Sequence, residues 1–336
     1  MHIYRRAALS VLASFVLAGC ARMPVTQPLS RNHAAAIQPV DVKIGIKQPE
    51  LYASFEPSRA GQSAAAACGA IPGLGILLAA ACGGAAGAMD ASINATRAKA
   101  ADETIRPLKD ELVDLKFDQL MNESVTKSLQ GVPGMQLSAV GVIKTVDDKT
   151  YEELLRSSTS NAVMFINVDY HISKDFSTLD VSARGLVYPR SASARSAAGF
   201  PVDLPLPDNP QEKVLALKNT VYRVSVFYHA KLPIQAEDSS AYIAAWKANN
   251  GQLLRSGLLD GTAHVTRLLA EDLQRAPEAQ RTVLSTVEVD KKLKADLIAE
   301  SNDGQLLRYP DGSLHFKAAM ATSAETATPL KPVAAK

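Results

Sequence analysis

The alternation of apolar and polar residues in the middle of the chain predicts a set of β-strands. Residues 162–172 and 177–188 alternate with a period of two and are joined by a turn at Lys174 and Asp175, which is typical of a hairpin. Residues 220–232 are rich in Val, Tyr and Phe and predict a further strand. The middle of the chain therefore contributes neighbouring strands of one sheet.

Apolar residues at helical spacing flank these strands. They recur between residues 90 and 129, where Pro107 predicts a break or a new first turn. The period then changes, and residues 135–143 predict another strand. A long amphipathic helix is predicted from a cap at Ser239 or Ser240 to about residue 275.

The remaining segments are predicted from their prolines, glycines and charges. Residues 189–210 contain five prolines and predict an exposed loop. Residues 277–300 are charged and predict a helical segment, and residues 305–316 predict a hairpin with its turn at 310–312. Residues 317–336 predict a disordered tail, because Ala, Thr, Pro and Lys predominate there.

The order of these elements predicts an α/β fold, a mixed β-sheet with packed helices. It would form a domain over residues 99–276, followed by the helical segment and hairpin of residues 277–316. The element order loosely resembles the α/β domains of TolB N-terminal regions, of curli-secretion lipoproteins and of lipoprotein activators of peptidoglycan synthases. That resemblance implies a periplasmic domain.

The N-terminal residues have the pattern of a targeting signal. Arg5 and Arg6 precede the short apolar run 7–16, which is typical of a cleaved targeting segment and too short to be a stable membrane span. Leu17 and the small residues Ala18 and Gly19 then lead directly to Cys20, and this tetrapeptide resembles the lipobox of bacterial lipoproteins. The resemblance implies that residues 1–19 are a signal peptide and that Cys20 is lipidated.

The residue after the cysteine refines the location. Ala21 stands where an Asp would retain a lipoprotein in the inner membrane under enterobacteria-like sorting rules, so the resemblance implies the periplasmic face of the outer membrane. Residues 20–59 contain several prolines without sustained periodicity and predict an extended tether, in which residues 42–46 form a short strand.

Residues 60–98 predict a Gly/Ala-rich helical hairpin that precedes the domain. A break at Pro72 and Gly73 would separate its two arms. Small residues recur every fourth position in the second arm and predict a close-packing helix face: Gly75, Ala79, Gly83, Gly87 and Ala91. The segment resembles the glycine-zipper region of many outer-membrane lipoproteins. It would pack on its own domain, self-associate or insert into the membrane.

Two further cysteines lie in this segment. Cys68 and Cys82 enclose a short loop, and the periplasm permits a disulfide. They are either bridged or two buried free thiols, because one continuous helix would hold the sulfurs too far apart to bond.

The composition and the motifs of the sequence limit the partners and cofactors that can be expected. The precursor has 36 basic and 34 acidic residues, and removing Arg5 and Arg6 leaves a formal balance of zero, which argues against nucleic acid as a partner. The sequence contains no P-loop, dinucleotide fingerprint, GxSxG elbow or metal-spaced Cys/His cluster, so no cofactor and no metal are expected.

Two groups of side chains remain as candidates. Asp169 and His171 share one strand face and would form a polar cluster with His229 if their strands pair; the alternative is a solvent-facing polar strand side. Three arginines give a basic patch around the proline-rich loop, which would contact lipid headgroups or anionic glycan, or remain solvated: Arg184, Arg190 and Arg195.

These observations favour a non-catalytic envelope lipoprotein that acts as a binding or assembly component. Its expected partners are the lipid bilayer, through Cys20, and another envelope protein or a second copy of the chain. The alternatives are an oligomeric pore assembled through the glycine-zipper helices and a periplasmic hydrolase that uses the histidines.

Overall fold

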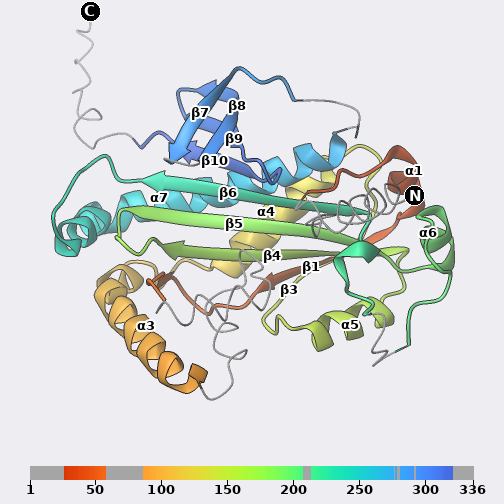
Figure 1. Cartoon of the computed structure of the whole chain (residues 1–336), viewed down its shortest axis with the longest axis horizontal. Helices are drawn as coiled ribbons and strands as arrows, with labels where there is room; N and C mark the ends of the chain where they lie inside the picture. Colours follow the sequence, from red (N-terminus) through yellow and green to blue (C-terminus); the bar gives the residue numbers. More distant parts are fainter. Residues whose placement is uncertain are drawn as a thin grey trace, which may run out of the picture.

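The computed structural model describes residues 26–57, 86–206, 213–275, 277, 281–290 and 293–320, with the side chains of 86–92 left aside. Ten strands form one mixed sheet with helices packed on it, so the predicted α/β class is confirmed (Figure 1). The strands are β1 (Val40–Ile46), β2 (Tyr52–Ala53), β3 (Leu137–Ile143), β4 (Ala162–Ile172), β5 (Thr178–Pro189), β6 (Tyr222–Lys231), β7 (Ser285–Asp290), β8 (Leu293–Ser301), β9 (Gly304–Arg308) and β10 (Leu314–Ala318).

The sheet combines parallel and antiparallel pairs. The strand order is β3-β1-β4-β5-β6-β10-β9-β8-β7, and β2 also pairs with β4. Strand β1 is parallel to both β3 and β4, whereas β4, β5 and β6 form an antiparallel meander. Strand β10 joins β6 in parallel and leads into the antiparallel pairs with β9, β8 and β7.

The helices of the described residues are α1 (Arg31–Ala36), α3 (Ala86–Asp110), α4 (Phe117–Gln130), α5 (Asp148–Ser157), α6 (Ala192–Ala197), the 3₁₀ turn η1 (Leu217–Asn219) and α7 (Ser239–Gln274). Helix α7 crosses β5 and β6 behind the sheet in Figure 1 and packs on α4 and α3. Pro107 lies in the last turn of α3, so the break between α3 and α4 falls at residues 111–116 instead of at the proline.

Glycines bring α7 close to the sheet. A Cβ at Gly261 would lie 2.7 Å from Val181 Cγ2, and one at Gly257 would lie 2.8 Å from a methyl of Leu179. Both glycines are buried and lie four residues apart, so they share the helix face that contacts β5. This helix face is packed too tightly for any larger side chain.

Helix α7 begins and breaks at positions that the periodicity did not predict. Its N-cap is Asp238, whose carboxylate accepts a hydrogen bond from the Ala241 N–H, so the cap predicted at Ser239 or Ser240 lies one residue earlier. Three consecutive residues then adopt left-handed backbone angles and divide the helix in two: Asn249, Asn250 and Gly251. Asparagine and glycine tolerate this conformation better than other residues.

The opposite face of the sheet is apolar at one end and polar along the rest. Helix α5 covers Val163 and Phe165 together with Leu186 and Tyr188, and the segment around Val214 completes this second core. Beyond it, most residues that alternate outward from β4, β5 and β6 are charged or hydrogen-bonding, and Phe227 stacks among them on His315. This polar stretch contains the candidate sites.

The predicted tether is wrong for the residues that the structure describes. Val42, Ile44 and Ile46 of β1 are fully buried, and Ile37 and Leu51 are buried as well. The sequence predicts only a short, weakly alternating strand here, but β1 is an internal strand, second from the edge of the sheet, because β3 and β4 pair on its two sides. The segment 26–57 thus belongs to the fold.

Two further predictions are corrected. Residues predicted as a charged helix over 277–300 form β7 and β8, whose apolar side chains Ala295 and Leu297 pack with Leu307 of β9. The predicted loop over 189–210 contains α6, where Ala194 and Arg195 are buried. Since β10 pairs with β6, residues 281–320 continue the main sheet.

Several predictions lie outside the described residues, namely Cys20, Cys68, Cys82, Gly75, Ala79 and Gly83, and the tail beyond residue 320. Gly87 and Ala91 fall within α3, which begins at Ala86. In the part of the chain that the structure describes, every helix is too short or too polar to cross a membrane.

Candidate functional site

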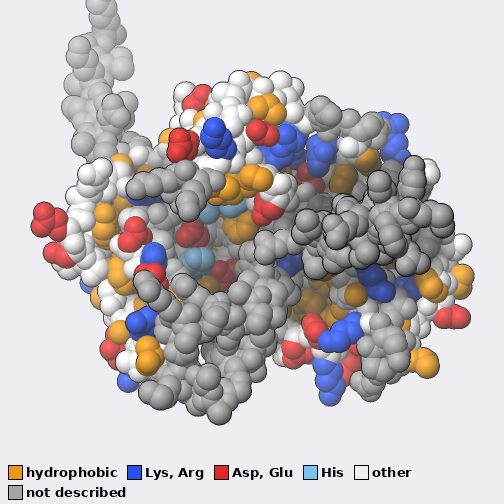
Figure 2. Space-filling view, in the orientation of Figure 1, with side chains coloured by type: hydrophobic (Ala, Val, Ile, Leu, Met, Phe, Trp, Pro, Cys, Tyr) orange, Lys and Arg blue, Asp and Glu red, His pale blue; other side chains and the backbone are white. Residues whose placement is uncertain are grey.

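A row of polar side chains crosses five strands on the outward face of the sheet. It starts at Tyr52 on β2, passes through Asp169 and His171 on β4 and Asp180 on β5, and reaches His229 on β6 and His315 on β10. We call these six residues the Asp–His row. Figure 2 shows histidine side chains grouped near the centre of this face, with acidic side chains beside them.

The first half of the row is built around Asp169. Tyr52 Oη donates to both carboxylate oxygens at 2.9 and 3.0 Å, and His171 Nδ1 donates to Asp169 Oδ2 at 2.8 Å. The other nitrogen of His171 lies 3.6 Å from Asp180 Oδ2. Asp169 is buried, and its charge together with burial raises the pKa of Tyr52, so the phenol stays protonated and acts as a donor.

The second half continues from Asp180. His229 Nδ1 donates to Asp180 Oδ1 at 2.5 Å, and His229 Nε2 lies 2.9 Å from His315 Nδ1. His315 Nε2 is 3.0 Å from Ser313 Oγ, and Ser313 Oγ donates to Asp311 Oδ1 at 2.6 Å. The row therefore extends without a gap from β2 to the turn between β9 and β10.

The hydrogen bonds assign protons along this half. Since Ser313 gives its only proton to Asp311, His315 Nε2–H must donate to Ser313 Oγ. A neutral His315 then accepts at Nδ1 from His229 Nε2–H, and His229 Nδ1 lies 2.5 Å from Asp180 Oδ1. His229 thus contacts both Asp180 and His315 through its two ring nitrogens.

The two terminal histidines differ in their acid–base behaviour. Burial, and after it the neighbouring His229, lower the pKa of His315 to about 3. Burial also disfavours a charged His171, but its hydrogen bond to Asp169 and the charges of Asp169 and Asp180 outweigh burial and raise its pKa. The row thus holds one histidine neutral and favours the charged form of another.

The structure brings the predicted cluster together, though by a different route. Strands β4 and β6 do not pair, and β5 lies between them, so Asp180 connects the predicted Asp169 and His171 to His229. Sequence reasoning missed Asp180 although it alternates with Ser182 on a predicted strand. It also missed Tyr52 and His315, because the pairing of β2 with β4 and of β10 with β6 leaves no local signal.

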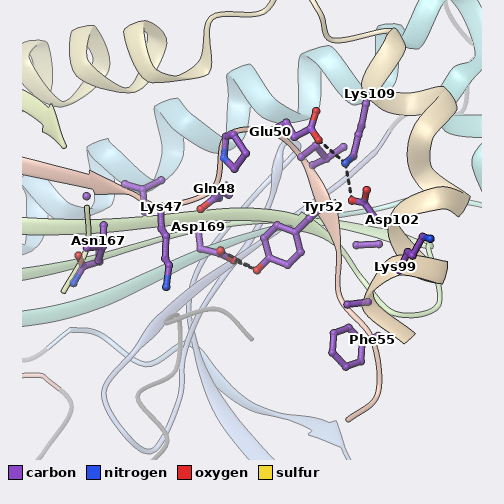
Figure 3. Close-up of a pocket in the computed structure, with 17 residues that line it drawn as sticks. Lys47, Gln48, Glu50, Tyr52, Phe55, Lys99, Asp102, Lys109, Asn167 and Asp169 are labelled. Carbon is purple, nitrogen blue, oxygen red and sulfur yellow. Dashed lines mark hydrogen bonds and ion pairs between the residues drawn. The ribbon is translucent and has the colours of Figure 1, made fainter. Parts of the chain in front are cut away.

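A pocket of about 430 Å³ opens at the Tyr52 end of the row (Figure 3). It lies between the β1–β2 connection, helix α3 and the end of β4. Its lining combines apolar side chains such as Leu51, Phe55 and Val146 with the polar Asn167 and Asp169. An apolar pocket with a few convergent polar groups is typical of a ligand-binding site.

Charged side chains surround the pocket. Lys109 Nζ bonds Glu50 at 2.8 Å and Asp102 at 2.6 Å, and these bonds raise the pKa of Lys109 against the effect of its burial. Lys47 is exposed, and Figure 3 shows it extended beside Asp169 without a bond between them. The side-chain amide nitrogen of Gln48 is buried with no hydrogen-bond partner. The pocket therefore offers donors to a ligand.

The predicted basic patch does not form. Arg190 Nη2 donates to the Arg156 carbonyl at 3.4 Å, and Arg195 is buried and donates from Nε to the Pro201 carbonyl at 2.6 Å. Arg184 instead lies on β5 within the outward face of the sheet, where its neighbour is Arg223 of β6. We call these two residues the arginine pair.

Neither metal geometry nor sequence similarity assigns a role to these features. Within the residues that the structure describes, His, Cys, Asp and Glu side chains form no group of three that could hold a metal ion. No protein-family model matches the chain, and no curated protein is similar to it in sequence.

Proposed function

We propose that this protein is a membrane-anchored, non-catalytic binding protein of the bacterial envelope, and that the pocket beside Tyr52 is its binding site. The pocket itself carries the proposal. Its volume of about 430 Å³ is within the range of small-molecule sites, and most of the surface that lines it is apolar, although many lining residues are polar or charged. The ligand class that fits has an apolar body and an acidic or hydrogen-bonding group, because Lys47 and Gln48 offer donors at the pocket.

The bonding of the Asp–His row supports binding over catalysis. His229 and His315 use both ring nitrogens within the row, and His171 uses Nδ1 there and directs Nε2 toward Asp180. A general acid or base must reach a proton of the substrate, which the ring nitrogens of His229 and His315 cannot do while they bond within the row. The row thus serves to hold the strands and the wall of the pocket in place.

The lipobox supports the anchor, and a short stretch of chain would separate the anchor from the domain. Gln27 pairs with Arg223 of β6, and seven residues of extended chain from Cys20 to Gln27 span at most about 25 Å. On this proposal the domain lies close to the bilayer surface. Cys20→Ala should release the protein from the membrane fraction without unfolding it, and retention in that fraction would locate the anchor elsewhere.

Filling the pocket tests the binding site. Ala98 of α3 lines the pocket, whereas Ala95 on the same helix is exposed and does not. The probe is anilinonaphthalene sulfonate, whose aromatic body and sulfonate match the apolar walls and the lysines. We expect Ala98→Trp to weaken probe binding by at least about 10-fold, because the indole occupies the space, and Ala95→Trp to leave it unchanged.

The outcome is read from fluorescence titrations of the two variants and the unaltered protein at equal folded fraction. Equal binding by Ala98→Trp and the unaltered protein would show that the probe binds elsewhere and would contradict the proposed site. Equal loss in both variants would point to a general effect of tryptophan on α3 and would also count against it.

A further inference from the structure

The arginine pair occupies the middle of the outward sheet face. Arg184 on β5 lies directly opposite Ser225 on β6, and Arg223 lies two residues before Ser225 on the same strand. Both guanidinium groups therefore project from the same face as diagonal neighbours, whose backbones are about 7–8 Å apart and whose long side chains reach each other. Two like charges are thus held side by side on rigid strands.

These two arginines lack the partners that buried cations normally have. Arg223 is only 3 % exposed, and its Nε and Nη1 atoms are buried without a hydrogen-bond partner. The Nε of Arg184 is buried and unpartnered as well. Burial lowers the pKa of both groups, and the charge of Arg223 lowers that of Arg184 further.

The carboxylates of Asp169 and Asp180, on the same sheet face, already bond to other side chains. Asp169 bonds to Tyr52 and His171, and Asp180 bonds to His229. Within the described residues no carboxylate lies within ion-pair distance of Arg184 or Arg223, whereas Arg255, Arg267 and Arg308 each pair with one. Buried charges are ordinarily paired, because an unpaired charge loses its hydration without compensation.

We propose that Arg184 and Arg223 form a binding site for a phosphate-type oxyanion. A planar guanidinium presents two parallel N–H donors that match two oxygens of a phosphate, and two guanidiniums on adjacent strands would hold it from both sides. The buried Ser225 lies opposite Arg184 and two residues after Arg223 on the same face, and its hydroxyl would supply a further donor. The oxyanion would neutralise the repulsion that the pair otherwise bears.

The source of the phosphate is either a phospholipid headgroup or free phosphate. Arg223 exchanges both backbone hydrogen bonds with Gln27, at 2.8 and 2.9 Å, so the pair lies next to the segment that leads back to Cys20. The closeness to a bilayer rests on the proposed lipid anchor, but the oxyanion site itself does not depend on the anchor or on the pocket.

Binding is tested on the purified full-length protein in neutral detergent. The probes are inorganic phosphate and glycerophosphoglycerol, the soluble diester headgroup of phosphatidylglycerol, each titrated calorimetrically at constant ionic strength with chloride as the reference anion. The variants are Arg184→Gln, Arg223→Gln and the double variant. The matched control is Arg267→Gln, which removes the same charge from the surface of α7, where Arg267 pairs with Glu271.

Each substitution in the pair is expected to weaken phosphate binding by about 10-fold or more, because it removes a charge-assisted bidentate contact, and Arg267→Gln should leave it unchanged. Binding of the diester as well as phosphate would identify a lipid headgroup as the source, and binding of phosphate alone would identify the free anion. Undetectable binding of both probes, or equal binding by the double variant, would overturn the proposal. Failure of the Ala98→Trp test would leave this result untouched.

Discussion

Two polar groups on one sheet face are built in opposite ways. In the Asp–His row every ionisable side chain has a partner within the row, from Tyr52 to His315. In the arginine pair, Arg184 and Arg223 are adjacent cations without a carboxylate partner. The two groups lie on the same strands, β5 and β6, so their differences arise from side-chain chemistry and not from the backbone.

The comparison distinguishes groups that stabilise the fold from groups that are available to bind a ligand. A fully satisfied polar network rigidifies its surroundings, and removing one member exposes the others to uncompensated burial. An unsatisfied buried charge weakens the fold by itself and persists where it serves binding. The row and the pair should therefore respond to substitution in opposite directions.

The largest effect is expected at the centre of the row. Asp180→Ala removes the carboxylate that bonds His229 at 2.5 Å and lies 3.6 Å from His171. We expect the free energy of unfolding to fall by about 2–3 kcal/mol, because a bond to a carboxylate is lost and a partly buried ring nitrogen of His229 loses its partner. Urea denaturation followed by circular dichroism measures the change.

Glu153→Ala is the control for this prediction. Glu153 lies on the exposed side of α5, and its removal should change the free energy of unfolding by less than about 0.5 kcal/mol. If Asp180→Ala were no more harmful than Glu153→Ala, the row would contribute nothing measurable and the contrast with the arginine pair would disappear.

A smaller effect is expected in the pH dependence of stability. The folded-state pKa of His315 is about 3, well below the value of about 6.5 in an unfolded chain. Between these values the unfolded chain binds a proton that the folded protein does not, so folding loses stability as the pH falls. We expect His315→Asn to remove about 1–2 kcal/mol of the loss between pH 7 and pH 5.

The readout is the difference between the two stability profiles, measured by urea denaturation at several pH values. His171 has a raised folded-state pKa, so its contribution is present at low pH and is lost as the pH rises through that value. It affects both proteins alike and cancels in the difference. The groups that face His315, namely His229, Asp311 and Lys317, also remain in both. Parallel profiles would contradict the assignment of a neutral His315.

Local sequence patterns predicted several elements but not their pairing. The alternation over 162–172 predicted β4 at its observed bounds, because successive side chains of a strand point to opposite faces of the sheet. The buried segment 26–57 was read as a tether, since a short strand such as β1 becomes recognisable only when distant strands pair on both sides. The charged residues 285–301 form strands for a similar reason, because β9 supplies their partner.

The candidate sites, too, could be predicted only where their residues lie close together in the sequence. Asp169 and His171 could be placed together because they are two residues apart on one predicted strand. The arginine pair could not be foreseen, since Arg184 and Arg223 are 39 positions apart in the sequence and meet only through the register of β5 and β6. Arg184, Arg190 and Arg195 are close in sequence, and the fold separates them. A site whose residues meet only through the register of paired strands thus leaves no signal in local sequence patterns.

The smallest effect on stability is expected at the arginine pair. Here the direction of the change in the free energy of unfolding is a stronger test than its size. Arg223→Met keeps an unbranched side chain of similar length but removes a buried cation with two unpartnered nitrogens. Replacing such a charge by an apolar group of similar shape is neutral or stabilising, so the free energy of unfolding should stay the same or rise by up to about 1 kcal/mol in phosphate-free buffer. Saturating phosphate should then raise the melting temperature of the unaltered protein only, because a ligand stabilises the state that binds it. A loss of 2 kcal/mol or more, on the order expected for a broken polar network, would mean that Arg223 is a structural member like Asp180 and that the two groups do not differ in kind.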